Sequence, residues 1–134
     1  MHPAAVAIQS DLLEGKNVLL IEDSLIIALD AEDILRRLGA ADVVTDGTVP
    51  GAILSIENAP PDIAVLDINL GDHDSFAIAD KLDDEGIPFL FATGYGEQAI
   101  LPERHRARIV MQKPYSLQSM ARCVPELIRK AAGA

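Results

Sequence analysis

The chain has 134 residues, of which 49% are hydrophobic and 24% are charged, so it can form one domain with a buried core. Its 21 acidic and 11 basic residues give a formal net charge of −10, which argues against binding to nucleic acid or to an anionic membrane surface. The single cysteine, Cys123, allows no internal disulfide; no apolar run approaches the roughly 20 residues that span a bilayer, and no signal peptide is recognisable, so we expect a cytoplasmic protein.

Apolar runs alternate with helical patterns along the whole chain after residue 16. Residues 1–16 are an N-terminal extension, for which a short amphipathic helix over Ala4–Leu13 and disorder both stay open. The domain proper is expected to span residues 17–134. Within it, continuous apolar runs of the kind that form strands buried on both faces are Val18–Ile21, Asp42–Thr45, Ile63–Leu66, Pro88–Ala92 and Ile109–Met111.

Apolar residues at helical spacing fill the intervals between these runs. They predict helices over Ser24–Leu38, Thr48–Ala59, Ser75–Leu82 and Ser116–Ala132, and a short, weakly patterned segment over Glu97–His105. Gly39 and the Pro60-Pro61 pair are expected to end the first two helices, and Pro125 to kink or restart the last one. The order reads strand then helix five times. It predicts an α/β fold with an open, doubly wound parallel sheet, because five units are too few for an eight-fold barrel.

Polar residues close four of the apolar runs. Glu22 and Asp23 follow the first run, Asp67 the third, Thr93 the fourth and Lys113 the fifth. Because ligands of open α/β sheets bind outside the carboxyl ends of the strands, these side chains are expected to converge at one edge. Three adjacent carboxylates repel one another unless a cation lies among them, and oxygen ligands without cysteine or histidine favour Mg²⁺.

A phosphoryl-transfer site fits this set of residues. Asp67 is the expected nucleophile, and Glu22 and Asp23 are the expected metal carboxylates, with the backbone carbonyl of Asn69 as a further ligand. Lys113 and the Thr93 hydroxyl would each take one phosphoryl oxygen. Taken singly, each of these residues is more commonly a solvated loop or surface residue; only their joint placement at the strand ends favours a site.

These residues resemble the receiver domain of two-component response regulators, over roughly Asn17 to Ala132. The family pattern is an acidic pair, an aspartate, a threonine or serine, and Lys-Pro after strands one, three, four and five, and here it stands as Glu22-Asp23, Asp67, Thr93 and Lys113-Pro114. The resemblance implies a flavodoxin-like (βα)5 fold with strand order 2-1-3-4-5 and a cis Lys113-Pro114 bond.

The resemblance also implies a function. Asp67 would accept a phosphoryl group from a histidine kinase or a phosphotransfer protein in a Mg²⁺-dependent step, and the domain would act through protein–protein contact rather than as an enzyme. Residues 91–96, Phe-Ala-Thr-Gly-Tyr-Gly, resemble a subfamily named for its Phe-Ala-Thr-Gly segment, associated with alphaproteobacteria and kinases of the HWE/HisKA2 type. Since no output domain follows before Ala134, we expect a stand-alone switch.

Two features depart from the family pattern. The position three residues before the lysine, aromatic in typical receivers, is Val110 here, and Tyr95 is a candidate substitute. The segment from Gly94 to His105 is glycine-rich and contains Pro102, so we expect a short or mobile fourth helix, with order–disorder carrying the signal.

Three other interpretations stay open. The first is a phosphorylation-independent interaction module, which the absent aromatic favours. The second is an aspartyl-phosphate phosphatase of the haloacid-dehalogenase type, which Asn69 disfavours because that chemistry needs an acid two residues after the nucleophile. A flavin-binding role is weaker still, because acidic residues after the first strand are a poor phosphate cradle. The extra apolar residues Leu25, Ile26 and Leu29 fit either a kinase-docking surface or core packing.

Overall fold

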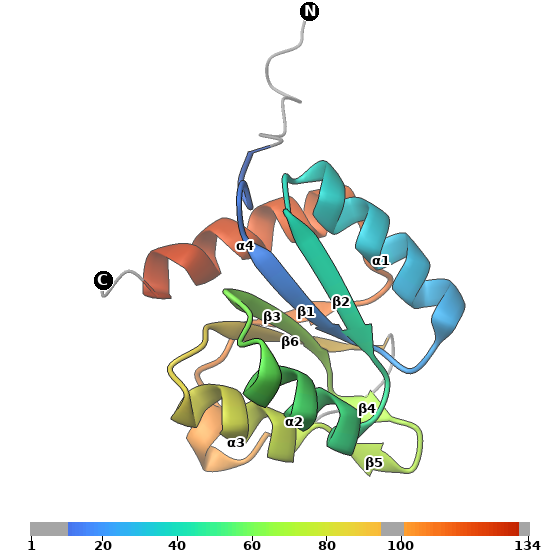
Figure 1. The fold of residues 1–134 in the computed structure, drawn as a ribbon, viewed down its shortest axis with the longest axis vertical. Helices are drawn as coiled ribbons and strands as arrows, with labels where there is room; N and C mark the ends of the chain where they lie inside the picture. The colour runs from blue at the N-terminus through green and yellow to red at the C-terminus, as the bar shows by residue number, and fades with distance from the viewer. Residues whose placement is uncertain (1–10, 95–100, 132–134) are drawn as a thin grey trace, which may run out of the picture.

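The computed structural model describes residues 11–94 and 101–131, and its centre is a five-stranded parallel sheet. The sheet order is β2-β1-β3-β6-β7, which in chain order is the predicted 2-1-3-4-5 (Figure 1). The prediction of a doubly wound, flavodoxin-like α/β fold is therefore confirmed. The strands are β1 (Asn17–Ile21), β2 (Asp42–Asp46), β3 (Ile63–Asp67), β6 (Phe89–Thr93) and β7 (Val110–Gln112).

Helices cover both faces of this sheet. Helices α1 (Leu25–Arg37) and α4 (Leu117–Ala131) lie on one face, and α2 (Val49–Asn58) and α3 (Phe76–Asp84) lie on the other (Figure 1). Successive strand residues point to opposite faces, and both faces are buried. In β1, for example, Val18 and Leu20 join the core beneath α1 and α4, while Leu19 joins the core beneath α2 and α3. Because both faces are buried, successive positions of the strand are all apolar, which explains the continuous apolar runs in the sequence.

The helix ends follow local side-chain chemistry. The Ser24 hydroxyl accepts a hydrogen bond from the backbone N–H of Ile27 at the start of α1 (3.4 Å), and the Thr48 hydroxyl accepts one from Gly51 at the start of α2 (3.1 Å). Helix α1 ends before Gly39, whose φ of +103° lies in the left-handed region that favours glycine, as predicted. These caps fix the chain where it leaves β1 and β2.

Helix α4 is continuous through Pro125, so of the two outcomes predicted for this proline the restart is wrong, and the kink stays a prediction. Proline removes one backbone hydrogen bond and strains the preceding turn. Here the apolar stripe on either side of it is buried, with Met120 and Val124 before the proline and Leu127 after it. Burial of that stripe against the sheet favours one helix over two separate segments.

The weak segment between β6 and β7 forms only a 3-10 turn, η2 (Glu103–His105), in its described part. The predicted fourth strand–helix unit therefore has no α-helix among residues 101–109, and Tyr95 lies outside the described residues. Side chains hold the turn in place instead. His105 is buried, with Nε2 2.7 Å from Asp80 Oδ1 on α3, and Arg104 Nε donates to Asp83 Oδ2 at 2.8 Å.

Two short strands, β4 (Asn69–Leu70) and β5 (His73–Asp74), were not expected from the sequence. They pair antiparallel directly after Asp67, and the turn between them contains Gly71 at a φ of +67°. The hairpin is too short for a periodic apolar pattern to reveal it. Its position matters because it places the turn beside the carboxyl ends of β1 and β3.

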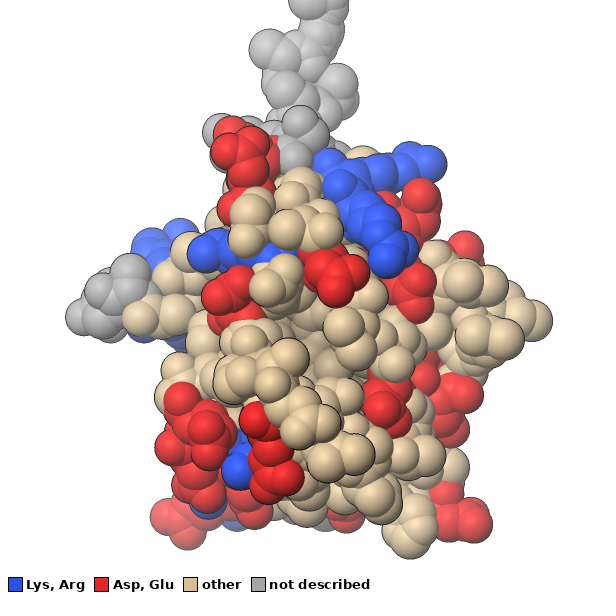
Figure 2. Space-filling model, viewed as in Figure 1, with Lys and Arg blue, Asp and Glu red and all other residues tan. Residues whose placement is uncertain are grey.

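The N-terminal extension enters the fold at Leu13, which is buried and whose backbone N–H donates to the Leu38 carbonyl at 2.7 Å. Most of the helix considered for Ala4–Leu13 lies outside the described residues. No helix within residues 11–94 or 101–131 has the length and apolar character needed to cross a membrane. Acidic side chains are spread over the face seen in Figure 2, in line with the negative net charge.

Candidate functional site

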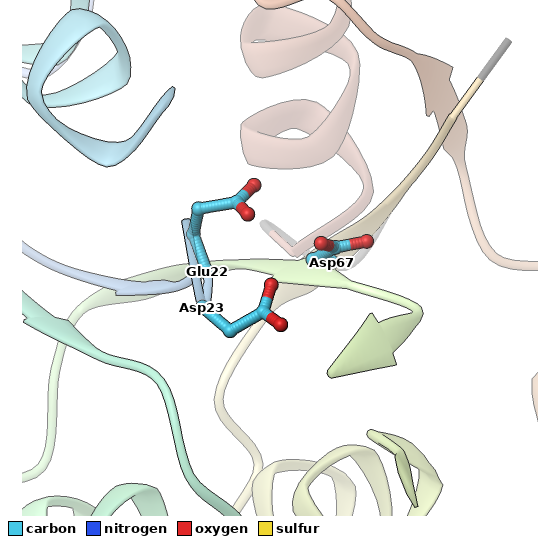
Figure 3. Close-up of side chains that lie close together, drawn as sticks. All are labelled: Glu22, Asp23 and Asp67. Atoms are coloured by element: carbon cyan, nitrogen blue, oxygen red, sulfur yellow. The ribbon is translucent and has the colours of Figure 1, made fainter. Parts of the chain in front are cut away.

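The carboxyl ends of β1 and β3 bring three carboxylates together. These strands pair in register with Ile21 beside Leu66, so the residues that follow, Glu22 and Asp67, become neighbours across the sheet. Asp23 comes next in the chain. One carboxylate oxygen from each of the three lies within 4.8 Å of the others, and Figure 3 shows the three side chains gathered at the strand ends. The sequence placed these residues at one edge, and the structure places them in one cluster.

Lys113 lies against two of the three carboxylates. Its Nζ is 2.8 Å from Glu22 Oε1 and 3.0 Å from Asp67 Oδ2. The side chains of Glu22 and Asp67 are buried, with exposed fractions of 1% and 5%, and that of Lys113 is half-buried, with an exposed fraction of 14%. A cis peptide bond joins Lys113 to Pro114, and the Lys113 backbone N–H donates to the Thr93 carbonyl at 2.8 Å. The charged pairs are therefore largely shielded from bulk water. Coulomb interactions in such surroundings are stronger than they are in water.

Burial and charge shift the pKa values at this cluster. Burial raises the pKa of Asp67 from 3.8 to about 6; the hydrogen bond from Lys113 acts in the opposite direction, and the charge of Glu22 adds to the rise. Burial works against the charge of Lys113, but its hydrogen bonds to Glu22 and Asp67 outweigh that effect and raise the Lys113 pKa. At neutral pH the lysine is charged and Asp67 is mostly ionised.

Thr93 and Asn69 lie close to Asp67 in the fold: Thr93 follows Ala92, which pairs with Asp67 across the sheet, and Asn69 is two residues further along the chain. Thr93 ends β6, and its buried hydroxyl has no hydrogen-bond partner within the described part of the chain. Asn69 begins β4, and its backbone N–H donates to Asp67 Oδ1 at 3.3 Å. A buried hydroxyl without a partner is costly, so within residues 11–94 and 101–131 the Thr93 hydroxyl is left as a donor for a ligand oxygen at this place.

The cluster fits a hard divalent cation. Three carboxylates against one ammonium leave two negative charges unbalanced, and all the side-chain donors are oxygens. Asp23 is exposed, so a cation can reach the cluster from solvent. The backbone closes in around it: a side-chain carbon at Gly47 would lie 3.1 Å from Asp23 Cα, and one at Gly71 would lie 3.7 Å from Asp23 Oδ2.

Sequence reasoning did not foresee the part that Tyr115 takes in this site. Tyr115 is buried, and its hydroxyl is 3.3 Å from Glu22 Oε1, a contact that spans 93 residues of sequence. Only its position two residues after the lysine marks it in the sequence. Val110, the position where typical receivers have an aromatic residue, is 43% exposed on the edge strand β7.

The first turns of α1 carry an exposed apolar surface. Leu25, Ile26 and Leu29 are 73%, 77% and 56% exposed, so the interpretation of these residues as core packing is wrong. They follow the acidic pair closely in the chain. With core packing excluded, a docking surface is the interpretation that remains. His73 is exposed in the β4–β5 hairpin and Cys123 is a half-buried free thiol, and neither joins the cluster.

Comparisons with known proteins give a consistent set of relatives, although no protein-family model matches the chain. The chain is 27% identical over 114 residues to the phyllosphere-induced regulator PhyR of Methylorubrum extorquens; the match covers 83% of this chain but less than half, 43%, of that regulator. It is 36% identical to SdrG of Sphingomonas melonis Fr1, whose solution structure matches with a TM-score of 0.75 over 87% of this chain and 98% of SdrG.

Two further solved structures extend this set. SdrG in its BeF3-activated conformation matches with a TM-score of 0.71 at 36% identity, over 84% of this chain and 95% of that one. The N-terminal domain of a response regulator/sensory box/GGDEF protein from Carboxydothermus hydrogenoformans matches with a TM-score of 0.75 at 25% identity, over 88% and 98% of the two chains.

Proposed function

The chain belongs to the receiver domains of response regulators, and from that premise we propose that it is a phosphoacceptor switch whose Asp67 takes a phosphoryl group from a histidine kinase or a phosphotransfer protein. The observation that carries the proposal is the buried Asp67 carboxylate, held 3.0 Å from Lys113 inside a cluster of three carboxylates. The switch then acts through contact with other proteins, in the cytoplasm, and without turnover as an enzyme.

The proposed chemistry is a displacement at phosphorus. An Asp67 carboxylate oxygen attacks, the P–N bond of the donor's phosphohistidine breaks, and the imidazole leaves with the electron pair and takes up a proton. Lys113 supplies positive charge to one phosphoryl oxygen, and the unpartnered Thr93 hydroxyl donates to another. Asp23, Asp67 and the Asn69 backbone carbonyl, with Glu22 beside them, would hold Mg²⁺, which would supply the remaining charge neutralisation.

Two observations support the proposed phosphoryl group as the ligand and a kinase or a phosphotransfer protein as its donor. The relative SdrG, 36% identical, has a structure described as BeF3-activated, and beryllofluoride imitates a phosphoryl group on a carboxylate. The exposed apolar turns of α1 adjoin the acidic pair, where a kinase or a phosphotransfer protein must approach. We extend the proposal to kinases of the HWE/HisKA2 type on the strength of the Phe-Ala-Thr-Gly segment.

Labelling with a radioactive phosphoryl donor tests this function. We expect the protein, with Mg²⁺ and labelled acetyl phosphate or a labelled histidine kinase, to take up close to one phosphoryl group per chain, and we expect Asp67→Asn to take up none. Asp62→Asn is the matched control, because Asp62 is an exposed carboxylate just before the same strand and should leave labelling unchanged. Labelling of Asp67→Asn, or no labelling of the native chain by any donor, contradicts the proposal.

The exposed valine at position 110 favours one competing function, an interaction module that works without phosphorylation. That function requires equal partner affinity for the native chain and Asp67→Asn, with and without the donor. A partner affinity that changes only when Asp67 is labelled supports the switch.

A further inference from the structure

Tyr115 makes a contact with the site that the proposed chemistry does not use. Its hydroxyl lies 3.3 Å from Glu22 Oε1, the same oxygen that lies 2.8 Å from Lys113 Nζ. The lysine Nζ is also 5.7 Å from the centre of the Tyr115 ring. Burial, together with the charge of Glu22, raises the pKa of Tyr115, so the phenol is neutral and its O–H donates to the carboxylate. One residue thus touches both members of the Glu22–Lys113 pair.

Glu22 differs from the other two carboxylates in how completely it is bound. Its Oε1 accepts from Lys113 and Tyr115, and its Oε2 accepts from the Ser24 backbone N–H at 3.1 Å. Its side chain is 1% exposed. Asp23, by contrast, is exposed and receives no hydrogen bond or ion pair from the described residues. Glu22 is therefore held in one orientation by three donors, whereas Asp23 has no such donor among the described residues.

We propose that Tyr115 is a positioning residue whose hydroxyl holds Glu22 as the counterion of Lys113, and thereby fixes the lysine ammonium beside Asp67, ready for an incoming phosphoryl group. The inference rests on the proposed phosphoacceptor function and adds a residue to it. Lys113 has a flexible four-carbon side chain between two competing carboxylates. Fixing the orientation of one carboxylate reduces the number of positions that the ammonium can take.

The phosphorylation rate of Tyr115→Phe tests this role, because phenylalanine keeps the buried ring and removes only the hydroxyl. One hydrogen bond to a charged group corresponds to a rate change of about ten-fold, so we expect the rate constant for labelling by acetyl phosphate with Mg²⁺ to fall by about that factor. Thr45→Val is the matched control, since the Thr45 hydroxyl donates to the Glu32 carboxylate at 2.5 Å outside the cluster. That variant should label at the native rate.

A second measurement follows the lysine itself, without metal or donor. In the metal-free native protein we expect a slowly exchanging Lys113 ammonium signal in ¹H–¹⁵N NMR spectra, and in Tyr115→Phe a broadened signal that exchanges faster with water. In a Glu22→Gln background the tyrosine substitution should change neither the ammonium signal nor the labelling rate further, because the carboxylate through which it acts is gone.

The outcomes separate this inference from the function it rests on. If the native chain is not labelled, the proposed function fails, and the ammonium signal still tests the positioning of Lys113. If the native chain is labelled and Tyr115→Phe has both the native rate and the native ammonium signal, the role of Tyr115 is refuted. A loss of folding stability in Tyr115→Phe with an unchanged rate and signal also refutes it, because that pattern belongs to a merely structural hydroxyl.

Discussion

Replacing Lys113 with methionine is expected to lower the free energy of unfolding by about 3 kcal/mol at pH 8 without divalent cations, because removing one partner of a buried ion pair leaves an uncompensated charge. In this chain the change leaves two such charges, since Lys113 contacts both Glu22 and Asp67 and both carboxylates are at most 5% exposed. Methionine fills a volume similar to that of the lysine stem. The loss is therefore assigned to charge rather than to a cavity.

Lys81→Met is the control for this substitution. Lys81 Nζ also contacts two carboxylates, Glu57 at 3.5 Å and Glu85 at 3.3 Å, but these partners are 53% and 44% exposed. Exposed ion pairs contribute little, so this variant should lose far less stability than Lys113→Met. Urea unfolding followed by circular dichroism measures both variants. Equal losses for the two lysines would show that burial of the carboxylates has no energetic consequence at this cluster.

The strands and the acidic edge of the sheet could be predicted from the sequence because both are set locally. A run such as Ile63–Leu66 is apolar at every position, and only a strand covered on both faces needs that pattern. Because all strands of a parallel sheet run in the same direction, the residues that end them lie at the same edge of the sheet. Asp67 and Thr93 are therefore placed by counting along the chain, without any knowledge of packing.

The partners of those residues could not be predicted in the same way. The contact from Tyr115 to Glu22 joins positions 93 residues apart, and it depends on the rotamer of each side chain in a finished core. His105 and Asp80 illustrate the same limit, because the turn that carries His105 has no periodic pattern and is held by side-chain contacts alone. Pro125 shows the reverse case: the local signal allows a restart of the helix, but the residues on both sides of the proline are buried and the helix runs through it.

Replacing Asp67 with asparagine is expected to stabilise the metal-free protein by about 2 kcal/mol at pH 8. The folded-state pKa of Asp67 is about 6, against 3.8 for an ordinary aspartate. Each pKa unit corresponds to about 1.4 kcal/mol, so holding this carboxylate ionised in the fold costs up to about 3 kcal/mol above pH 6. That cost already includes the favourable contacts with Lys113, and asparagine removes it; the buried amide is itself desolvated, so the gain falls short of the full amount.

The dependence on pH follows from the direction of the shift. Because the pKa of Asp67 is raised in the folded state, its stabilising contribution is present below pH 3.8 and is lost as the pH rises through about 6. The advantage of Asp67→Asn should therefore be largest above pH 6 and disappear towards pH 4. Thermal or urea unfolding in a chelating buffer at pH 4, 6 and 8 measures it, with Asp62→Asn, a substitution of an exposed carboxylate outside the cluster, as the control.

Adding Mg²⁺ should reverse the order of stability, so that the native chain becomes more stable than Asp67→Asn. A cation that binds only the folded state stabilises it by RT ln(1 + [Mg²⁺]/Kd), which is about 2.7 kcal/mol at a concentration of one hundred Kd. The native chain has the full cluster and gains this term, whereas Asp67→Asn has lost one carboxylate and gains less. A native chain whose unfolding midpoint does not move with Mg²⁺ at pH 8 would contradict the assignment of Asp67 to a cation site. On this prediction, the cation binds because it neutralises carboxylates whose burial destabilises the metal-free fold. The burial that weakens the metal-free protein therefore also prepares Asp67 for its ligand.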